Sequence, residues 1–437
     1  MWLIDLSWKR EKTGLHRQHI AVKSSLFCGA ILLLTILCRA EQIFAYSVLT
    51  HEEVVDLLWK DEIVPNLRAR FPGLTEAQLR EAHAYSYGGS VIQDLGYYPF
   101  GNKEFSNLTH YVRSGDFVQE MIRQSRDANE FAFAMGALAH YVSDESGHPA
   151  VNQSVALLYP KLRAKYGASV TFAENKTAHI KTEFGFDVAQ VAKNRYVSDQ
   201  YHNFVGFQVS KSLLERVFPI VYGRKLSDVI PNLDLTIGSY RYAVSQFIPM
   251  LTTSAAKAQK NNIPPSSATP AQQLFQYRLS RAEYEKEWGT TYSKPGFFLR
   301  ILGALTRVIP KVGPLRKVMF RPPTPETQEL YVQSINATVD LYKKYLRQVR
   351  SGSLALRNLD LDSGKPSTPL EYTLSDETHE DLLIQLSGDK FASVTPELRR
   401  TMMNYFANFN PPLKSRKDRS HWRKVQESLM KLKSAPQ

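Results

Sequence analysis

The run FAFAMGALA, Phe131 to Ala139, most constrains how this chain folds, because it is apolar or small on every helical face. A helix of that kind must be surrounded by other elements. The nine residues that follow it, His140 to His148, contain two histidines and two carboxylates. A carboxylate that this helix carries into the interior needs a compensating cation, because an unpaired buried charge is costly.

The surrounding sequence predicts an all-α fold. THEE at Thr50 and TEAQ at Thr75 have the pattern of a capping box, the signature of a helix start. Apolar residues between Thr50 and Met250 recur at intervals of three and four, and no alternating strand pattern is visible. The chain has 437 residues, 43% of them hydrophobic and 22% charged, which is ordinary for a folded soluble protein.

The first 45 residues have the pattern of an export signal. Basic residues precede the apolar run Leu26–Cys38, which is shorter than the roughly 20 residues of a membrane span. We expect a secreted or periplasmic protein whose mature chain begins at Tyr46; cleavage after Ala40 and an uncleaved anchor are the alternatives. Both cysteines, Cys28 and Cys38, lie in this segment, so the mature chain would have no disulfide. A lipoprotein modified at Cys38 is disfavoured by the bulky residue before it.

Beyond the signal, the expected organisation is a catalytic domain over residues 46–250, a linker over 251–273 and a mostly helical C-terminal region over 274–437. The linker is small, polar and proline-bearing. Residues 294–323 form an amphipathic stretch with seven basic residues and no acidic one, and a helix is expected from Thr324 to about Val349. This basic stretch suits either an anionic membrane surface or packing on the catalytic domain.

Two pairs of ligand-type residues share the spacing of one helical turn. His140 and Asp144 are four residues apart, as are His179 and Glu183, so each pair projects from one face of a helix. An imidazole and a carboxylate so placed can bind the same metal ion, and zinc suits this donor set. His148, beside Pro149 where we expect the helix to stop, could supply a third ligand to the cluster.

Three upstream residues extend the candidate set, although each also has a plain structural explanation. Asp94 lies in a turn-rich stretch, His110 in SNLTHYV and His51 in the first turn of the helix that Thr50 would cap. Together with the two pairs and His148, they offer more ligands than one metal ion requires. The sequence therefore predicts a multinuclear centre.

The order of these residues resembles the bacterial zinc-dependent phospholipase C family and its single-strand nuclease relatives. The matching pattern is an N-terminal aromatic residue, a nearby histidine, an aspartate, a histidine, H-x-x-x-D with a following histidine, and H-x-x-x-E, over residues 46–250. The resemblance implies an all-helical catalytic domain around three zinc ions. Two departures are a tyrosine where tryptophan is usual and a short interval between Asp144 and His148.

The resemblance also implies which residues would hold each ion. The first would be bound by Asp94, His110, His140 and Asp144, and the second by His148, His179 and Glu183. Asp144 would bridge to the third, which would also bind His51 and the free amine and carbonyl of Tyr46. Since only a processed N-terminus can do this, export would activate the enzyme.

The function implied is phosphodiester hydrolysis by zinc-activated water, with Asp94 as a general base. We predict a phospholipase C that acts on phospholipids at a membrane surface and releases diacylglycerol and a phosphorylated headgroup. A single-strand nuclease is the first alternative, because the net charge of +13 would attract nucleic acid as well as anionic lipid. A non-catalytic, metal-stabilised membrane-binding protein is the second. No protein partner is predicted.

Overall fold

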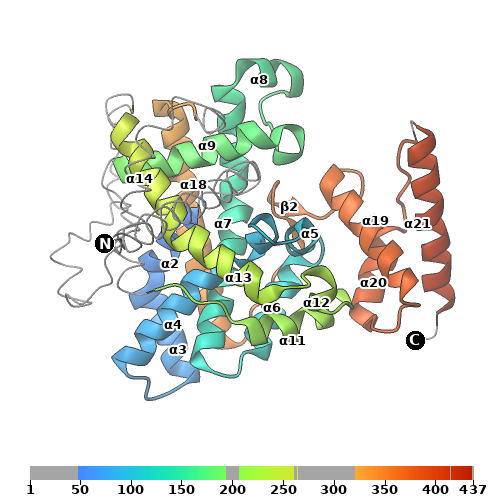
Figure 1. Cartoon of the computed structure of the whole chain (residues 1–437), viewed down its shortest axis with the longest axis horizontal. Helices are drawn as coiled ribbons and strands as arrows, with labels where there is room; N and C mark the ends of the chain where they lie inside the picture. Colours follow the sequence, from blue (N-terminus) through green and yellow to red (C-terminus); the bar gives the residue numbers. More distant parts are fainter. Residues whose placement is uncertain (1–47, 193–205, 260–262, 264–319, 414, 436–437) are drawn as a thin grey trace, which may run out of the picture.

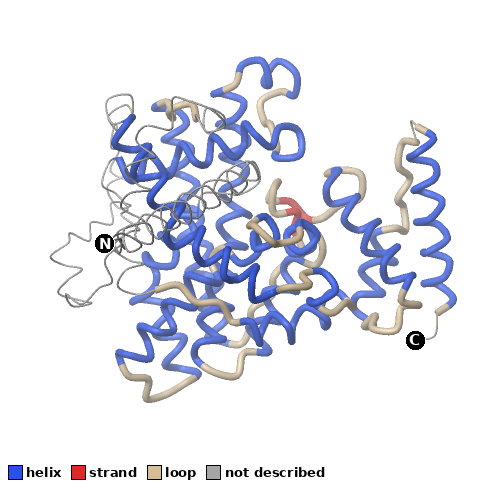
Figure 2. The backbone as a smooth tube through the Cα atoms, viewed as in Figure 1, coloured by secondary structure: helices blue, strands red, loops and turns tan. Residues whose placement is uncertain are grey.

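The computed structural model describes residues 48–192, 206–259, 263, 320–413 and 415–435. Within these ranges the regular secondary structure is almost entirely helical, as predicted (Figure 2). The helices before the first gap are α2 (Val48–Leu58), α3 (Val64–Arg70), α4 (Glu76–Gly89), α5 (Lys103–Tyr111), α6 (Ser114–Gln124), α7 (Ala128–Leu158), α8 (Pro160–Tyr166) and α9 (Phe172–Ala192), with a π-helical turn η2 (Trp59–Ile63) and a 3₁₀ turn η3 (Ile92–Tyr97).

The later elements complete the helical body. They are α11 (Lys211–Tyr222), α12 (Leu226–Val229), α13 (Leu233–Tyr242), η4 (Ala243–Phe247), α14 (Ile248–Gln259), α18 (Pro325–Ser351), α19 (Thr373–Gly388), α20 (Pro396–Tyr405) and α21 (Arg416–Ser434). Two short antiparallel strands, β1 (Leu359–Asp360) and β2 (Lys365–Pro366), form a hairpin. Helices α19, α20 and α21 lie together at one end of the molecule (Figure 1).

The central element is α7, and residues Phe131 to Ala139 are buried as the sequence predicts. Glycines let α4 approach it closely. A Cβ at Gly136 would lie 2.0 Å from the carbonyl oxygen of Ser86, and a Cβ at Gly89 would lie 2.0 Å from that of Phe133. Only glycine permits backbones this close. The close approach brings the end of α4 against the histidine-bearing part of α7.

Helix α7 does not stop at Pro149, so the predicted helix end is wrong. It continues to Leu158 with the proline inside. Proline removes the hydrogen bond to the carbonyl four residues earlier, which belongs to Glu145. The hairpin turn packs there, since a Cβ at Gly364 would lie 2.3 Å from that oxygen. His148 is therefore one further helical turn along the stripe that His140 and Asp144 begin.

Of the expected helix starts, two are confirmed and one is wrong. Thr75 and Thr324 cap α4 and α18, each in a capping box. Thr50 lies inside α2, which begins at Val48, and its hydroxyl is 3.3 Å from a carboxylate oxygen of Asp187 and 2.7 Å from the hydroxyl of Tyr331. A tertiary hydrogen bond has thus replaced the predicted cap.

The C-terminal region shares the core of the catalytic helices, which differs from the expected division at residue 250. One hydrophobic cluster includes side chains from Val48 to Leu432. The hydroxyl of Tyr342 on α18 donates to the carbonyl of Met135 on α7 at 2.8 Å. Residues 251–259, expected in the linker, continue α14. The rest of that linker, apart from Ile263, and residues 264–319 lie outside the described residues, as do the expected signal and Tyr46.

None of the helices in the described ranges is both long enough and apolar enough to cross a membrane.

Candidate metal centre

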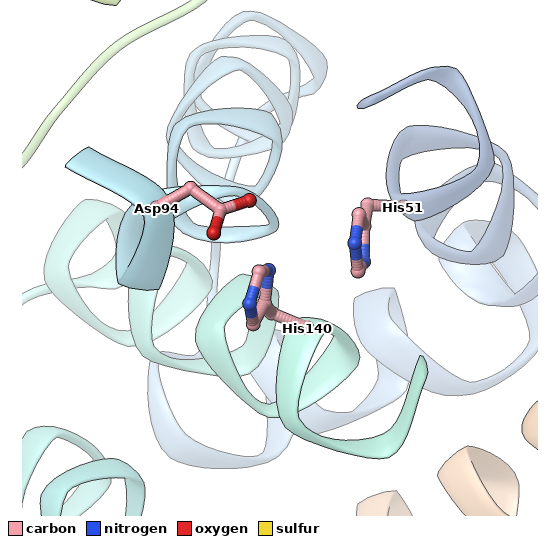
Figure 3. Close-up of side chains that lie close together, drawn as sticks. All are labelled: His51, Asp94 and His140. Atoms are coloured by element: carbon pink, nitrogen blue, oxygen red, sulfur yellow. The ribbon is translucent and has the colours of Figure 1, made fainter. Parts of the chain in front are cut away.

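The structure brings eight of the predicted ligands together at the middle of α7. They are His51 from α2, Asp94 from η3, His110 from α5, His140, Asp144 and His148 from α7, and His179 and Glu183 from α9. All eight are at most 2% exposed. Figure 3 shows the side chains of His51, Asp94 and His140 directed toward one another from three elements. The ninth predicted ligand, Tyr46, lies outside the described residues.

The ligand atoms form three groups, each within 4.8 Å: His51, Asp94 and His140; His110, His140 and Asp144; and His148, His179 and Glu183. The last is the set predicted for the second ion. In the predicted set for the first ion, Nε2 of His110 lies 3.4 Å from Asp94 and 3.5 Å from Asp144, and Nε2 of His140 lies 3.0 Å from Asp144.

Asp144 stands between these sets because its two oxygens face different histidines. Oδ2 faces Nε2 of His110 and His140, whereas Oδ1 lies 3.6 Å from Nε2 of His51 and 3.6 Å from Nε2 of His148. This is the arrangement that a bridging carboxylate needs. The i, i+4, i+8 spacing on α7 puts Asp144 between the two histidines of its own helix.

Backbone carbonyls fix the orientation of three of the imidazoles. Nδ1 of His110 donates to the carbonyl of Ser106 at 2.7 Å, that of His140 to Ser90 at 3.0 Å and that of His148 to Leu361 at 2.8 Å. A carbonyl only accepts, so Nδ1 carries a proton, and when the ring is neutral its Nε2 lone pair is directed into the centre. Metal-binding histidines are usually oriented in this way.

The buried carboxylates of the centre have oxygens that are available to bind a metal ion. Within the part of the chain that the structure describes, no hydrogen bond satisfies either carboxylate oxygen of Asp144 or of Glu183. Their polar neighbours include imidazole nitrogens, among them Nε2 of His179 at 2.9 Å from Glu183. Carboxylate oxygens and imidazole lone pairs converging in a buried space are the donor set of zinc, so the residues fit it.

The two aspartates have opposite pKa shifts. Burial opposes ionisation of both, but His140 and His148 hold the pKa of Asp144 well below its usual range. At Asp94, burial prevails and raises the pKa to about 6. Although burial lowers the pKa of His110 and His148, the neighbouring carboxylates raise these values to about 9 and about 10. Metal binding would therefore compete with protons and release them.

A second layer of the centre comes from the β1–β2 hairpin, and the sequence analysis missed it. The hairpin supplies the Leu361 carbonyl to His148, and Oδ1 of Asp362 lies 3.6 Å from Nδ1 of the same ring. The hydroxyl of Tyr111 donates to Oδ2 of Asp362 at 2.7 Å, and that of Tyr372 donates to the same oxygen. The only signal in the sequence was the turn-rich LDLDSG, which does not indicate what the turn contacts.

His83 is a further buried histidine, but it lies outside the centre. Its Nε2 lies 2.8 Å from Asp56, and its ring stacks on Trp59 with centroids 3.8 Å apart.

Comparison with known proteins confirms the resemblance. The family model described as zinc dependent phospholipase C matches residues 50–229, a range that includes all eight gathered residues. Neither the search of curated proteins nor that of solved structures found a match. The hairpin lies outside the matched range. Because the family implies a hydrolase, the non-catalytic alternative is not supported.

Proposed function

Residues 50–229 place the chain in the zinc-dependent phospholipase C family, a family of hydrolases, and from this premise we propose a secreted phospholipase C with three zinc ions. Its substrates are phospholipids, and its products are diacylglycerol and a phosphorylated headgroup. The observation that carries the proposal is the position of Asp144, whose two oxygens face two separate sets of histidines.

We assign the ligands to the three ions as the family resemblance implies. Asp94, His110, His140 and Asp144 would hold one ion, and His148, His179 and Glu183 a second. Asp144, His51 and the amine and carbonyl of Tyr46 would hold the third. When bound, zinc supplies an activated water and neutralises charge on the phosphate and the leaving oxygen.

The chain's own residues prepare the centre for that chemistry. The backbone carbonyls behind His110, His140 and His148 keep these rings in the tautomer that binds metal. Burial gives Asp94 a pKa of about 6, so it is largely ionised at neutral pH and can accept a proton from a nearby water. Asp144, with its lowered pKa, remains a carboxylate.

The proposal includes export and cleavage before Tyr46. Helix α2 begins at Val48 and carries His51 to within 3.6 Å of Asp144. Tyr46 is two residues earlier in the sequence, outside the described residues. In this proposal, cleavage before Tyr46 frees the amine that would bind the third ion, and an uncleaved signal would not provide it.

Metal content and hydrolysis of two substrates test the proposal together. The exported protein should begin at Tyr46, contain close to three zinc ions by elemental mass spectrometry, and release diacylglycerol from phospholipid vesicles while leaving single-stranded DNA intact. A metal-free active protein, or an active chain with an intact signal, would overturn the metal assignment. Cleavage of DNA without lipid hydrolysis would instead identify the nuclease.

A further inference from the structure

The buried centre is bordered by two partly exposed aromatic side chains. Tyr97 ends η3, three residues after Asp94, and its ring centroid lies 6.1 Å from that of His110. Phe172 begins α9, and its ring centroid lies 5.6 Å from that of His179. The two aromatic rings are 6.3 Å apart. Both rings contact ligand histidines and are themselves partly exposed, so they reach from the buried centre to the surface of the protein.

A lysine of the chain lies over both rings. Nζ of Lys176 is 5.2 Å from the centroid of Tyr97 and 4.9 Å from that of Phe172. Aromatic faces attract cations at these distances, and a quaternary or primary ammonium group of a headgroup would seek the same place. Here the protein's own ammonium group already occupies it.

Lys176 also forms no ion pair with the residues that the structure describes. It is half-buried, and burial lowers its pKa to about 8, with Lys103 acting in the same direction and Asp362 and Asp94 opposing. At neutral pH it therefore remains mostly a cation, partly removed from water and without a carboxylate partner. Such an ammonium group forms a strong charge-assisted hydrogen bond with an incoming anion.

The local helix geometry favours an anion at the same position. Asn175 has non-helical torsion angles, φ −154° and ψ 83°, that divide α9, and its side chain accepts a hydrogen bond from the amide of Ala178 at 2.9 Å. Lys176 is consequently the first residue of the helical segment that carries His179 and Glu183. A cation is unfavourable at a helix N-terminus, whereas an anion there is stabilised, so the lysine and the helix end would attract the same ligand.

We propose that Lys176, held over Tyr97 and Phe172, makes this enzyme selective for phospholipids whose headgroup carries no positive charge. The ammonium group would contact the phosphate or an uncharged polar headgroup, and it would repel the ammonium of a zwitterionic lipid. This inference rests on the proposed phospholipase C function and adds the substrate class to it.

The test uses short-chain lipids below their micelle concentration, so that surface charge plays no part. The zinc-loaded protein should hydrolyse dihexanoylphosphatidylglycerol with a kcat/KM about 10-fold or more above that for dihexanoylphosphatidylcholine. The reason is that the Lys176 ammonium would donate a charge-assisted hydrogen bond to the glycerol headgroup, whereas it would repel the ammonium of choline. Lys176→Met should reduce this ratio by about 10-fold, and Lys176→Arg should retain most of it.

A matched control is Lys165→Met. Lys165 also lies over an aromatic ring, that of Tyr166 at 4.6 Å, but in α8 rather than at the centre. Its replacement should leave the ratio unchanged. A preference for phosphatidylcholine in the wild-type protein, or an unchanged ratio in an active Lys176→Met variant, would overturn the inference.

Headgroup binding separates this inference from the proposed function. Calorimetry should show that the zinc-loaded protein binds glycerol phosphate more tightly than phosphocholine, and that Lys176→Met removes the difference. If neither lipid is hydrolysed but this binding preference is present, the phospholipase assignment fails and the role of Lys176 stands. Equal binding of the two compounds by the wild-type protein would overturn the role of Lys176 even if lipid is hydrolysed.

Discussion

Helix α7 and the β1–β2 hairpin contribute to the metal centre in different ways. Helix α7 supplies three ligand side chains at one-turn intervals and lies within the range that matches the family. The hairpin is about 200 residues later along the chain, outside that range, and supplies no member of the three ligand groups. It contributes the Leu361 carbonyl and the Asp362 carboxylate behind His148. The three ligands of α7 are thus local in sequence, whereas the support of His148 is not.

This difference between the ligands of α7 and the partner of His148 has a physical reason. A helix fixes the relative positions of side chains four residues apart without help from the rest of the fold. The orientation of each ring about its own bonds needs a partner behind it, and that partner can come from any element that packs nearby. For His148 the partner comes from the C-terminal region, so that region is part of the catalytic unit.

The largest effect on activity is expected from a substitution of Asp144, the carboxylate that α7 contributes to the centre. Asp144→Asn removes the charge that faces four histidines, so phosphodiesterase activity should fall by roughly 10³-fold or more, because loss of a supporting partner alone typically costs about 10–100-fold. The melting temperature should fall in zinc, since the bound metal stabilises the folded state, and this difference should shrink in chelator. Enzyme assay and calorimetry measure both.

Glu145→Gln is the control for Asp144→Asn. Glu145 is the next residue on the same helix, but it pairs with Arg357 at 3.1 Å instead of facing the centre. It should retain activity and the zinc-dependent increase in melting temperature. Full activity in Asp144→Asn would remove Asp144 from the ligand set.

A smaller effect is expected on the hairpin side, at Asp362. Asp362→Asn weakens the acceptor that holds Tyr111 and Tyr372 and removes the carboxylate beside His148. Zinc affinity of the set formed by His148, His179 and Glu183 should fall by about 10–100-fold. Competition with a chromophoric chelator measures this directly, and the melting temperature in chelator reports any general loss of stability.

Ser363→Ala changes the same hairpin without altering a contact to His148, because the Ser363 hydroxyl bonds to Asp360. Its zinc affinity should be that of the wild-type protein. If the two variants lower the affinity equally, Asp362 supports the hairpin and does not position His148.

The comparison also explains which parts of the centre could be predicted from the sequence. The pairs His140–Asp144 and His179–Glu183 were visible because helical periodicity is local, and the order of His51, Asp94 and His110 added the rest of the set. The end of α7 was predicted wrongly because Pro149 normally interrupts a helix, and the packing of Gly364 against the Glu145 carbonyl is a tertiary contact. Asp362 and Lys176 were missed for the same reason, since neither has a spacing that relates it to the ligands.

An effect on stability, rather than on activity or zinc affinity, tests the contact between the two regions themselves. Gly364 has a φ of +68°, and a Cβ there would lie 2.3 Å from the Glu145 carbonyl oxygen and 3.3 Å from Cγ of Pro149. Gly364→Ala should therefore lower the free energy of unfolding by about 2–4 kcal/mol, of which roughly 1 kcal/mol reflects the left-handed backbone and the rest the overlap with α7. Urea denaturation measures it.

Gly352→Ala separates these two contributions. Gly352 has nearly the same φ, +70°, but a Cβ there would meet nothing within 4 Å. This variant should lose only the backbone part, about 1 kcal/mol. Equal losses of unfolding free energy in the two variants would show that the hairpin can move away from α7 without a loss of stability. A larger loss in Gly364→Ala would show that the hairpin cannot move away from the Glu145 carbonyl of α7 without a cost in stability.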